Sequence, residues 1–278
     1  MSALFVTLDD DRYRIDPAAA IDISIPLDFH GAQPGHFGAP PARARPLVAG
    51  GFVGDTRRGG SCNCEILELT PHCNGTHTEC IGHVTGERVW VSERAREALV
   101  GALLLSVAPA PATASDESAD PAPHATDRIV TAAALARAAE RLGETGPPGG
   151  IAALVVRTLP NGSDKRTRDY GGPNAPPYLT LEAMRWIVDL GIRHLLVDLP
   201  SVDRSHDEGR LAGHRVFWGL PSGETKAGAA TRPDATITEM VFVADDVPDG
   251  RYALSLQLPP FLTDAAPSRP LLYPLATA

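Results

Sequence analysis

The sequence predicts an α/β fold with a central mixed β-sheet and flanking helices. Apolar runs at residues 151–156 and 194–198 are typical of buried strands, and the amphipathic segments 132–142 and 181–190 are typical of helices. These strands and helices alternate at the spacing of βαβ units, which place helices against a largely parallel or mixed sheet. The apolar stretch at residues 98–108 is too short to span a bilayer and predicts a further buried strand.

The N-terminal part of the chain predicts strands separated by one long loop. Strands are expected at residues 3–8 and 21–25, and an alternating pattern at residues 62–69 predicts a half-buried strand. Residues 31–45 are rich in Gly, Pro and Ala and predict a loop, which at this length is usually functional. Phe37, within this loop, is expected to pack in the core.

The C-terminal part predicts two capped helices and two late strands. Thr131 and Thr180 are placed to cap the two amphipathic helices, and Gly191 is placed to end the second one. Strands are expected at residues 236–243 and 252–257, where they complete the sheet.

The chain is predicted to form a single domain over residues 1–278. Its 278 residues are enough to bury a core without help from a metal or a disulfide. Residues 106–127 are of low complexity and lack apolar periodicity, which predicts a solvated surface excursion within the domain.

Composition excludes several classes of partner. The chain has 25 Lys and Arg against 34 Asp and Glu, and its net charge of −9 repels nucleic-acid phosphates. Its 7 Phe, 5 Tyr and 3 Trp offer few surfaces for base stacking. The acidic N-terminal segment does not resemble a signal peptide, so we expect a cytoplasmic protein without membrane or nucleic-acid partners.

Four cysteines lie close together in the sequence, at Cys62, Cys64, Cys73 and Cys80. Such clustering in a cytosolic chain favours metal binding or catalysis over a disulfide framework. Cys62 and Cys64 belong to the alternating segment, and we expect them to be small buried apolar residues of a strand.

The densest group of reactive side chains spans residues 72–83, with three His, two Cys and one Glu. In an extended chain His77 and Glu79 project to the same face. Gly75 allows the backbone to turn so that Cys73 can face the same point. Imidazole, thiolate and carboxylate together suit zinc, with manganese less favoured by a sulfur ligand. The segment therefore predicts a metal site.

The run from Cys73 to His83 resembles the motif H-x-G-T-H-x-D-x-P-x-H of the cyclase family of metal-dependent hydrolases. This family includes kynurenine formamidases and isatin hydrolase. Further family patterns are resembled in order by Asp22-Ile23-Ser24, Arg157-Thr158, Asp198-Leu199-Pro200-Ser201-Val202-Asp203, Leu211-Ala212-Gly213-His214 and Glu239. The resemblance covers roughly residues 20–260. It implies a swivelling β/β/α fold and a homo-oligomer, either dimer or tetramer. Apart from the resemblance, Asp203 is expected to cap a helix.

The resemblance also implies an activity, which is metal-assisted hydrolysis of a small amide such as an aryl-formamide or a cyclic amide. It implies a divalent metal, zinc or less favourably manganese, and proton transfer by His83 to the leaving amine. Glu79 has a second possible role, as the catalytic base. The implied metal ligands are Cys73 (or His72, one residue earlier), His77, Glu79, His214 and Glu239.

Three positions depart from the motif, because Cys73 replaces a histidine, Glu79 an aspartate and Ile81 a proline. A thiolate with two carboxylates would place three negative charges on one divalent ion and weaken it as a Lewis acid. Two alternatives therefore stay open. The chain is a divergent member that binds a small ligand in the same cleft without hydrolysis, or a metal-free enzyme that uses Glu79 and His83 as base and acid.

Overall fold

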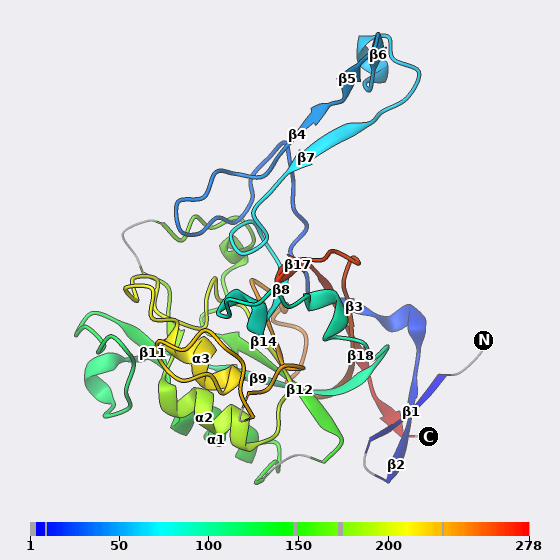
Figure 1. Cartoon of the computed structure of the whole chain (residues 1–278). Coiled ribbons are helices and arrows are strands. Elements are labelled where there is room, and N and C mark those ends of the chain that lie inside the picture. The colour runs from blue at the N-terminus through cyan, green and yellow to red at the C-terminus, as the bar shows by residue number, and fades with distance from the viewer. Residues whose placement is uncertain (1–3, 9, 147–148, 172–174, 230, 278) are drawn as a thin grey trace.

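A computed structural model of the chain describes residues 4–8, 10–146, 149–171, 175–229 and 231–277 (Figure 1). Among them, nine strands form one mixed sheet in the order β17-β8-β15-β14-β12-β9-β16-β18-β3. This arrangement confirms the predicted α/β fold. The strands in that order are β17 (Ala265–Pro267), β8 (His77–Cys80), β15 (Thr236–Glu239), β14 (His194–Val197), β12 (Ile151–Thr158), β9 (Val100–Val107), β16 (Gly250–Gln257), β18 (Arg269–Pro274) and β3 (Ile21–Asp22).

Four neighbouring strands of this sheet, β9, β12, β14 and β15, run parallel, while β8 pairs with β15 in the antiparallel direction. The amino end of β8 therefore meets the carboxyl ends of the parallel strands at one edge. In open α/β sheets this is the edge where ligands bind.

Smaller pairings surround the large sheet. The described residues form two further three-stranded sheets and two short hairpins. Their strands are β1 (Leu4–Leu8), β2 (Asp11–Ile15) and β19 (Ala276–Thr277); β10 (Ala110–Pro111), β11 (Arg128–Val130) and β13 (Tyr178–Leu179); β4 (Arg43–Pro46) with β7 (Glu65–Glu68); and β5 (Val48–Ala49) with β6 (Phe52–Val53).

The helices pack against one face of the sheet. They are α1 (Ala132–Glu140), α2 (Leu181–Asp189) and α3 (Ala212–Trp218). Leu135, Met184 and Phe217 join one apolar cluster with side chains such as Leu154 from that face. A second cluster, which includes Val155, covers the opposite face without a helix.

The predicted helix caps are confirmed. Thr131 Oγ1 accepts a hydrogen bond from the backbone N of Ala134 at 3.1 Å, and Thr180 Oγ1 accepts one from Ala183 N at 3.0 Å. Gly191 follows α2 with a φ of 78°, a conformation that favours glycine at a helix end.

The segment at residues 106–127 is tied to both of these helices. The carboxylate of Glu117 accepts hydrogen bonds from Ala132 N at 2.8 Å and Thr180 Oγ1 at 2.5 Å. Ser118 Oγ donates to Glu182 at 2.7 Å. Most side chains of the segment are exposed or half-buried, so it lies along the surface beside α1 and α2.

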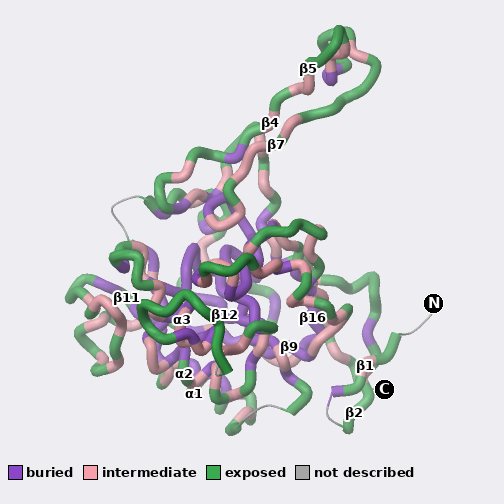
Figure 2. Tube along the Cα trace, viewed as in Figure 1, coloured by how far each residue is buried: buried purple, intermediate pink, exposed green. Residues whose placement is uncertain are grey.

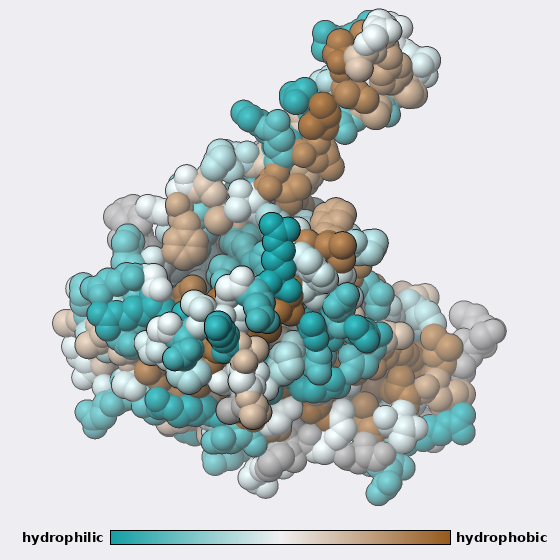
Figure 3. Space-filling view, in the orientation of Figure 1, coloured by the Kyte–Doolittle hydropathy of each residue, from teal (hydrophilic) through white to brown (hydrophobic). Residues whose placement is uncertain are grey.

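Residues 43–69 form a long arm that projects from the body of the molecule (Figures 1 and 2). β4 pairs with β7 along the stem of the arm. Apolar side chains gather along it (Figure 3), and Val48 and Leu67 are 58% and 52% exposed. The described part of the chain has no helix with the length and apolar character that a membrane crossing requires.

Three local expectations were wrong. Cys62 and Cys64 are exposed, because they lie in the projecting arm before β7, where no core exists to cover them. Phe37 is 58% exposed rather than in the core, since its loop turns outward at that residue. The late strand ends at Glu239, because Met240 takes a φ of 54° that breaks the extended backbone.

Candidate metal centre

The centre of the site is a pair of facing residues on adjacent strands. His77 begins β8 and Glu239 ends β15, and the two are register partners in the antiparallel pair. Directly opposed residues project to the same face of a sheet. His77 Nε2 accordingly lies 3.4 Å from Glu239 Oε2. Gly75 O, 3.0 Å from His77 Nδ1, holds the ring from behind, at a glycine whose φ of 89° makes the turn into β8.

Glu79 lies two residues after His77, on the same face, and its side chain is fully buried. Its Oε1 is 2.8 Å from His214 Nε2, and its Oε2 is 2.9 Å from His72 Nδ1 and 3.9 Å from His83 Nε2. Neither oxygen has a hydrogen-bond partner among the described residues, so these short distances lack the geometry of hydrogen bonds. Several imidazole nitrogens therefore converge on one buried carboxylate.

His214 reaches the cluster from α3. Its Nδ1 is 2.6 Å from Asp203 Oδ2, and its Nε2 is 3.6 Å from Glu239 Oε1. Asp203 also accepts hydrogen bonds from the backbone N of Gly213 at 2.7 Å and of His214 at 3.1 Å. The carboxylate of Asp203 thus binds backbone N–H groups at the start of α3 and also orients the imidazole of His214 on that helix.

His72 precedes β8 and is held between two carboxylates. Its Nδ1 meets Glu79, and its Nε2 lies 2.9 Å from Oδ2 of Asp264. Asp264, the residue before β17, also lies 3.5 Å from His83 Nδ1. The rings of His72 and His83 stack with centroids 4.1 Å apart. Asp264 therefore hydrogen-bonds to His72 and places a negative charge beside His83, the two partly exposed imidazoles of the cluster.

The charges in the cluster shift the pKa values of its members strongly. Burial lowers the pKa of His72, but its hydrogen bond with Asp264 and the adjacent carboxylate of Glu79 outweigh burial and raise it to about 10. Burial likewise opposes a charge on His214, yet the charge of Glu79 and the bond to Asp203 raise its pKa well above the usual value. The pKa of Glu79 lies well below its usual range, since His83 and His214 overcome the effect of burial.

The donor set fits a divalent cation. Three groups within the described residues bring their ligand atoms together: His72, His77 and Glu79; His72, His83 and Asp264; and Glu79, His83 and His214. His77 Nε2 and both oxygens of Glu79 are buried there without hydrogen-bond partners. Buried polar atoms without partners are costly, and a metal ion satisfies nitrogen and carboxylate donors at once.

Cys73 is buried beside this cluster but joins none of the three groups. Glu239 joins none of them either, but its carboxylate oxygens lie 3.4 Å from His77 Nε2 and 3.6 Å from His214 Nε2. Burial, together with the charge of Glu239, raises the pKa of the Cys73 thiol, which disfavours the thiolate that binds metals. Cys80 is also buried, and burial raises the pKa of its thiol to about 11. Instead of Cys73, His72 brings a ligand nitrogen to the carboxylate of Glu79.

Most of the residues singled out in the sequence meet in this site, namely His72, His77, Glu79, His83, His214 and Glu239. Sequence reasoning missed Asp264, because the segment around it resembles no motif and β17 lies far along the chain. It assigned Asp203 to helix capping. The N-cap residue of α3 is Leu211, but the carboxylate of Asp203 does accept hydrogen bonds from Gly213 N and His214 N in the first turn, and its contact with the His214 ring was not foreseen.

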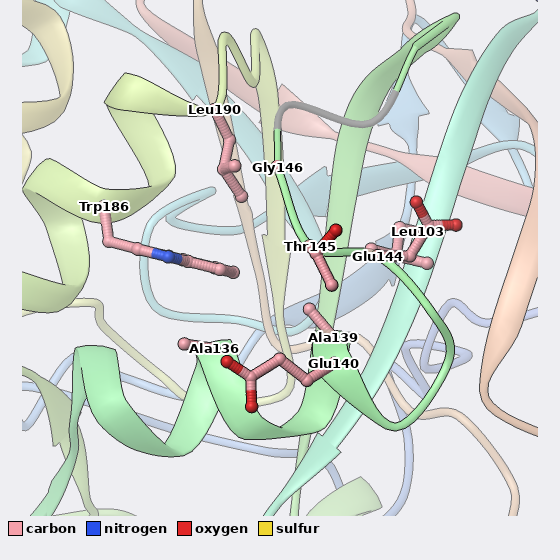
Figure 4. Close-up of a pocket in the computed structure, with 9 residues that line it drawn as sticks. All are labelled: Leu103, Ala136, Ala139, Glu140, Glu144, Thr145, Gly146, Trp186 and Leu190. Carbon is pink, nitrogen blue, oxygen red and sulfur yellow. The ribbon is translucent and has the colours of Figure 1, made fainter.

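A separate cavity of about 150 Å³ lies beside α1 and α2 (Figure 4). Trp186 and Leu190 line one side of it, and Ala136 and Glu140 line another. Its lining contains no histidine or cysteine, and most of it is apolar. It therefore offers carboxylates but neither imidazole nor thiol donors.

Comparison with known proteins agrees with this geometry. The family model named Cyclase matches residues 21–204, which is well over half of the chain and includes the Cys73–His83 run and Asp203. The chain belongs to the cyclase family. A protein described as kynurenine formamidase, from Bacillus cytotoxicus, is 31% identical over 128 residues, which are 45% of this chain and 51% of that protein. The match thus spans about half the length of the curated relative.

Solved structures share the fold over nearly the whole chain. Isatin hydrolase A from Labrenzia aggregata has a TM-score of 0.60 at 16% identity, with 93% of this chain and 94% of that chain covered. Isatin hydrolase A from Ralstonia solanacearum has a TM-score of 0.59 at 16% identity, with 91% of each chain covered. At this level of identity the similarity shows the fold.

Proposed function

We propose that this protein is a metal-dependent hydrolase of small amides, of the aryl-formamide or cyclic-amide class. The observation that carries the proposal is the buried carboxylate of Glu79, on which the imidazoles of His72 and His214 converge without hydrogen-bond geometry. Membership of the cyclase family and the partial similarity to kynurenine formamidase support the reaction class.

The metal is proposed to be zinc, with manganese as the alternative. Imidazole nitrogen and carboxylate oxygen are ligands that zinc accepts readily, and manganese accepts them too. The contacts favour His72 over Cys73 as the ligand that replaces the first histidine of the family motif, because its Nδ1 already lies 2.9 Å from Glu79. The proposed ligands are His72, His77, Glu79, His214 and Glu239.

A divalent cation bound at this cluster supplies Lewis-acid chemistry, which acidifies a water molecule and polarises an amide carbonyl. Asp203 orients His214 through Nδ1, which leaves Nε2 directed at Glu79. The backbone N of Val202 donates to Glu239 Oε1 at 2.9 Å and fixes that carboxylate.

His83 is proposed to move the proton that the leaving amine requires. Its side chain is 26% exposed, so it lies where a substrate can reach it, and the carboxylates of Glu79 and Asp264 lie 3.9 Å and 3.5 Å from its two nitrogens. A positioned imidazole can both give and take a proton near neutral pH. Glu79 remains the alternative base if it does not bind the metal.

We also propose that the protein acts on a small-molecule substrate in the cytoplasm as a homo-oligomer. The assembly follows from the family resemblance, and the projecting arm with exposed Val48 and Leu67 is a surface that a second copy could cover. Sedimentation of the purified protein tests the assembly: a monomer at micromolar concentration would contradict it.

The test of function is metal content together with hydrolysis. Protein purified without chelators should contain a divalent metal and hydrolyse formanilide or isatin, and His77→Ala should lose most of the metal while its far-UV spectrum stays native. Hydrolysis that persists after full metal removal would favour the metal-free acid and base reaction. Metal without hydrolysis of any amide tested would favour a member that only binds a ligand.

A further inference from the structure

Asp264 makes a hydrogen bond that orients the ring of His72. Its Oδ2 lies 2.9 Å from His72 Nε2, with the geometry of a hydrogen bond. The other ring nitrogen, Nδ1, lies 2.9 Å from Glu79 Oε2, and that oxygen has no hydrogen-bond partner among the described residues. When Nε2 donates its proton to a carboxylate, the lone pair of the neutral ring is on Nδ1. Two electron-rich atoms therefore face each other in a geometry that suits a metal ion better than a shared proton.

The separation of these two atoms is the one expected for ligands of a single ion. Zinc binds nitrogen and oxygen donors at about 2.0–2.2 Å, so two ligands at a right angle lie about 3 Å apart. His72 and Glu79 can thus share an ion without movement of either side chain, provided that the ring keeps its orientation. The side chain of His72 is 23% exposed, so burial alone does not hold it.

The carboxylate of Asp264 is held in place by the sheet. Asp264 directly precedes β17, which pairs with β8 (Figure 1). Its backbone O accepts a hydrogen bond from Cys80 N at 3.0 Å, and O of the preceding Thr263 accepts one from Val91 N at 2.9 Å. Strand pairing therefore brings this carboxylate to the cluster independently of the turn that carries His72.

That turn places His72 one position ahead of the first histidine of the family motif. Cys73 occupies the position of the motif histidine, and its thiol joins none of the groups of ligand atoms. The backbone N atoms of Cys73 and Asn74 both donate to Thr70 O, at 2.9 and 3.0 Å, which makes the turn tight. Neighbouring side chains of a tight turn project in different directions. A ligand moved from position 73 to position 72 therefore needs a partner of its own to orient it, and Asp264 supplies one.

We propose that Asp264 is a positioning residue, which holds His72 so that Nδ1 binds the metal and His72 takes the place of the missing histidine at position 73. The proposal rests on the metal centre of the proposed function, to which it adds a residue outside the family motif. Asp264 acts on the ligand and is not itself a ligand. Its contact with His83, at 3.5 Å from Nδ1, is the longer of its two contacts with imidazoles.

The test measures zinc affinity in a double-mutant cycle. Asp264→Ala removes the acceptor of the Nε2 proton, and His72→Ala removes the ring. Asp120→Ala is the matched control, because the side chain of Asp120 is 40% exposed against 39% for Asp264 and contacts Arg210 instead of an imidazole. Competition with a chromophoric chelator measures the affinity for zinc, and elemental analysis measures zinc per chain.

Asp264→Ala should weaken zinc binding by about 10- to 100-fold, as expected when the partner behind a metal-binding histidine is lost. In a His72→Ala background the same change should cost less than about threefold, since a residue that acts through the ring has no effect once the ring is gone. Asp120→Ala should bind zinc like the parent. An unchanged affinity in Asp264→Ala, or an equal loss in both backgrounds, would overturn the proposal. Loss of about half of the zinc would also overturn it, because Asp264 would then be a ligand of a second ion.

A measurement on the unsubstituted protein guards against misfolding of a variant. In the zinc-loaded protein the 15N spectrum of the His72 ring, assigned by its loss in His72→Ala, should show the proton on Nε2 and none on Nδ1. In Asp264→Ala this proton should exchange faster with solvent, because its acceptor is gone. A ring that binds zinc through Nε2, with its proton on Nδ1, would overturn the proposal.

Hydrolysis separates this proposal from the proposed function. Zinc binding that depends on Asp264 through His72, without hydrolysis of formanilide, would keep the positioning role and contradict the proposed function. Zinc-dependent hydrolysis with an affinity that does not change in Asp264→Ala would do the reverse. A parent protein that binds no zinc would contradict both.

Discussion

Asp203 holds His214 from the side opposite to Glu79. Oδ2 of Asp203 is 2.6 Å from Nδ1 of His214, while Nε2 of the same ring is 2.8 Å from Glu79 Oε1. A carboxylate behind a histidine fixes the tautomer of the ring and raises its basicity toward a metal. The contact thus links the start of α3 to the metal centre.

Asp203→Asn should weaken metal binding by about 10- to 100-fold, because the amide cannot supply the negative charge behind His214. Competition with a chromophoric chelator measures the affinity. Asp207→Asn is the matched control, since Asp207 Oδ2 accepts from Leu211 N at 2.7 Å near the same helix start. Equal losses in the two variants would show that the effect comes from α3 alone.

His72→Ala should lower the metal content, and Cys73→Ser should leave it nearly unchanged. The reason is that His72 contacts both Glu79 and Asp264, whereas Cys73 joins none of the groups that bring ligand atoms together. Elemental analysis of metal per chain decides between them. Loss of metal in Cys73→Ser alone would restore the thiol as the ligand.

His83→Ala should retain the metal while kcat for formanilide falls by about 100-fold or more, as expected when a positioned acid–base group is removed. KM should change little, because the group acts on a proton rather than on binding. A loss of about half the metal would contradict this role and would identify His83 as a ligand to a second ion.

His194 should make the protein less stable in mild acid. It is buried at the start of β14, where burial lowers its pKa to about 4 from the usual 6.5. Between these values the unfolded chain binds more protons than the folded one, so stability falls as the pH decreases. At pH 5 the loss from this residue is about 2 kcal/mol relative to pH 7.5.

Urea unfolding of His194→Asn at both pH values measures this loss. Asn can keep the contact that Nδ1 makes with Thr236 Oγ1 at 2.9 Å but takes up no proton. The decrease in the free energy of unfolding between pH 7.5 and pH 5 should be smaller in His194→Asn, whereas exposed His124→Asn should behave like the parent. Parallel curves for all three proteins would contradict the prediction.

The sequence predicted the central sheet and the first two helices because their apolar periodicity is continuous and their caps are local. Thr131 and Thr180 each cap a helix by a hydrogen bond to a backbone N only three residues later, so the sequence nearby is enough to predict it. Contacts between distant segments leave no such local signal. Asp264 meets His72 across 192 residues, and only the pairing of β17 with β8 brings them together.

The errors follow from context that a local pattern does not contain. The alternation around Cys62 and Cys64 is typical of a half-buried strand, but the arm there has no second layer to bury one face. Likewise Phe37 was expected in the core, but the path of its loop depends on the bridge between Gly35 and Asp169, which no pattern in a Gly-rich segment indicates.

The four thiols of the chain fall into two classes of exposure, because two lie in the projecting arm and two lie in the body of the molecule. Cys62 and Cys64 stand exposed on the projection, while Cys73 and Cys80 are buried and have raised pKa values. Thiols of raised pKa react slowly at neutral pH. A fluorescent maleimide would therefore label the arm selectively, and energy transfer between labelled copies would report whether the arms of two copies come together.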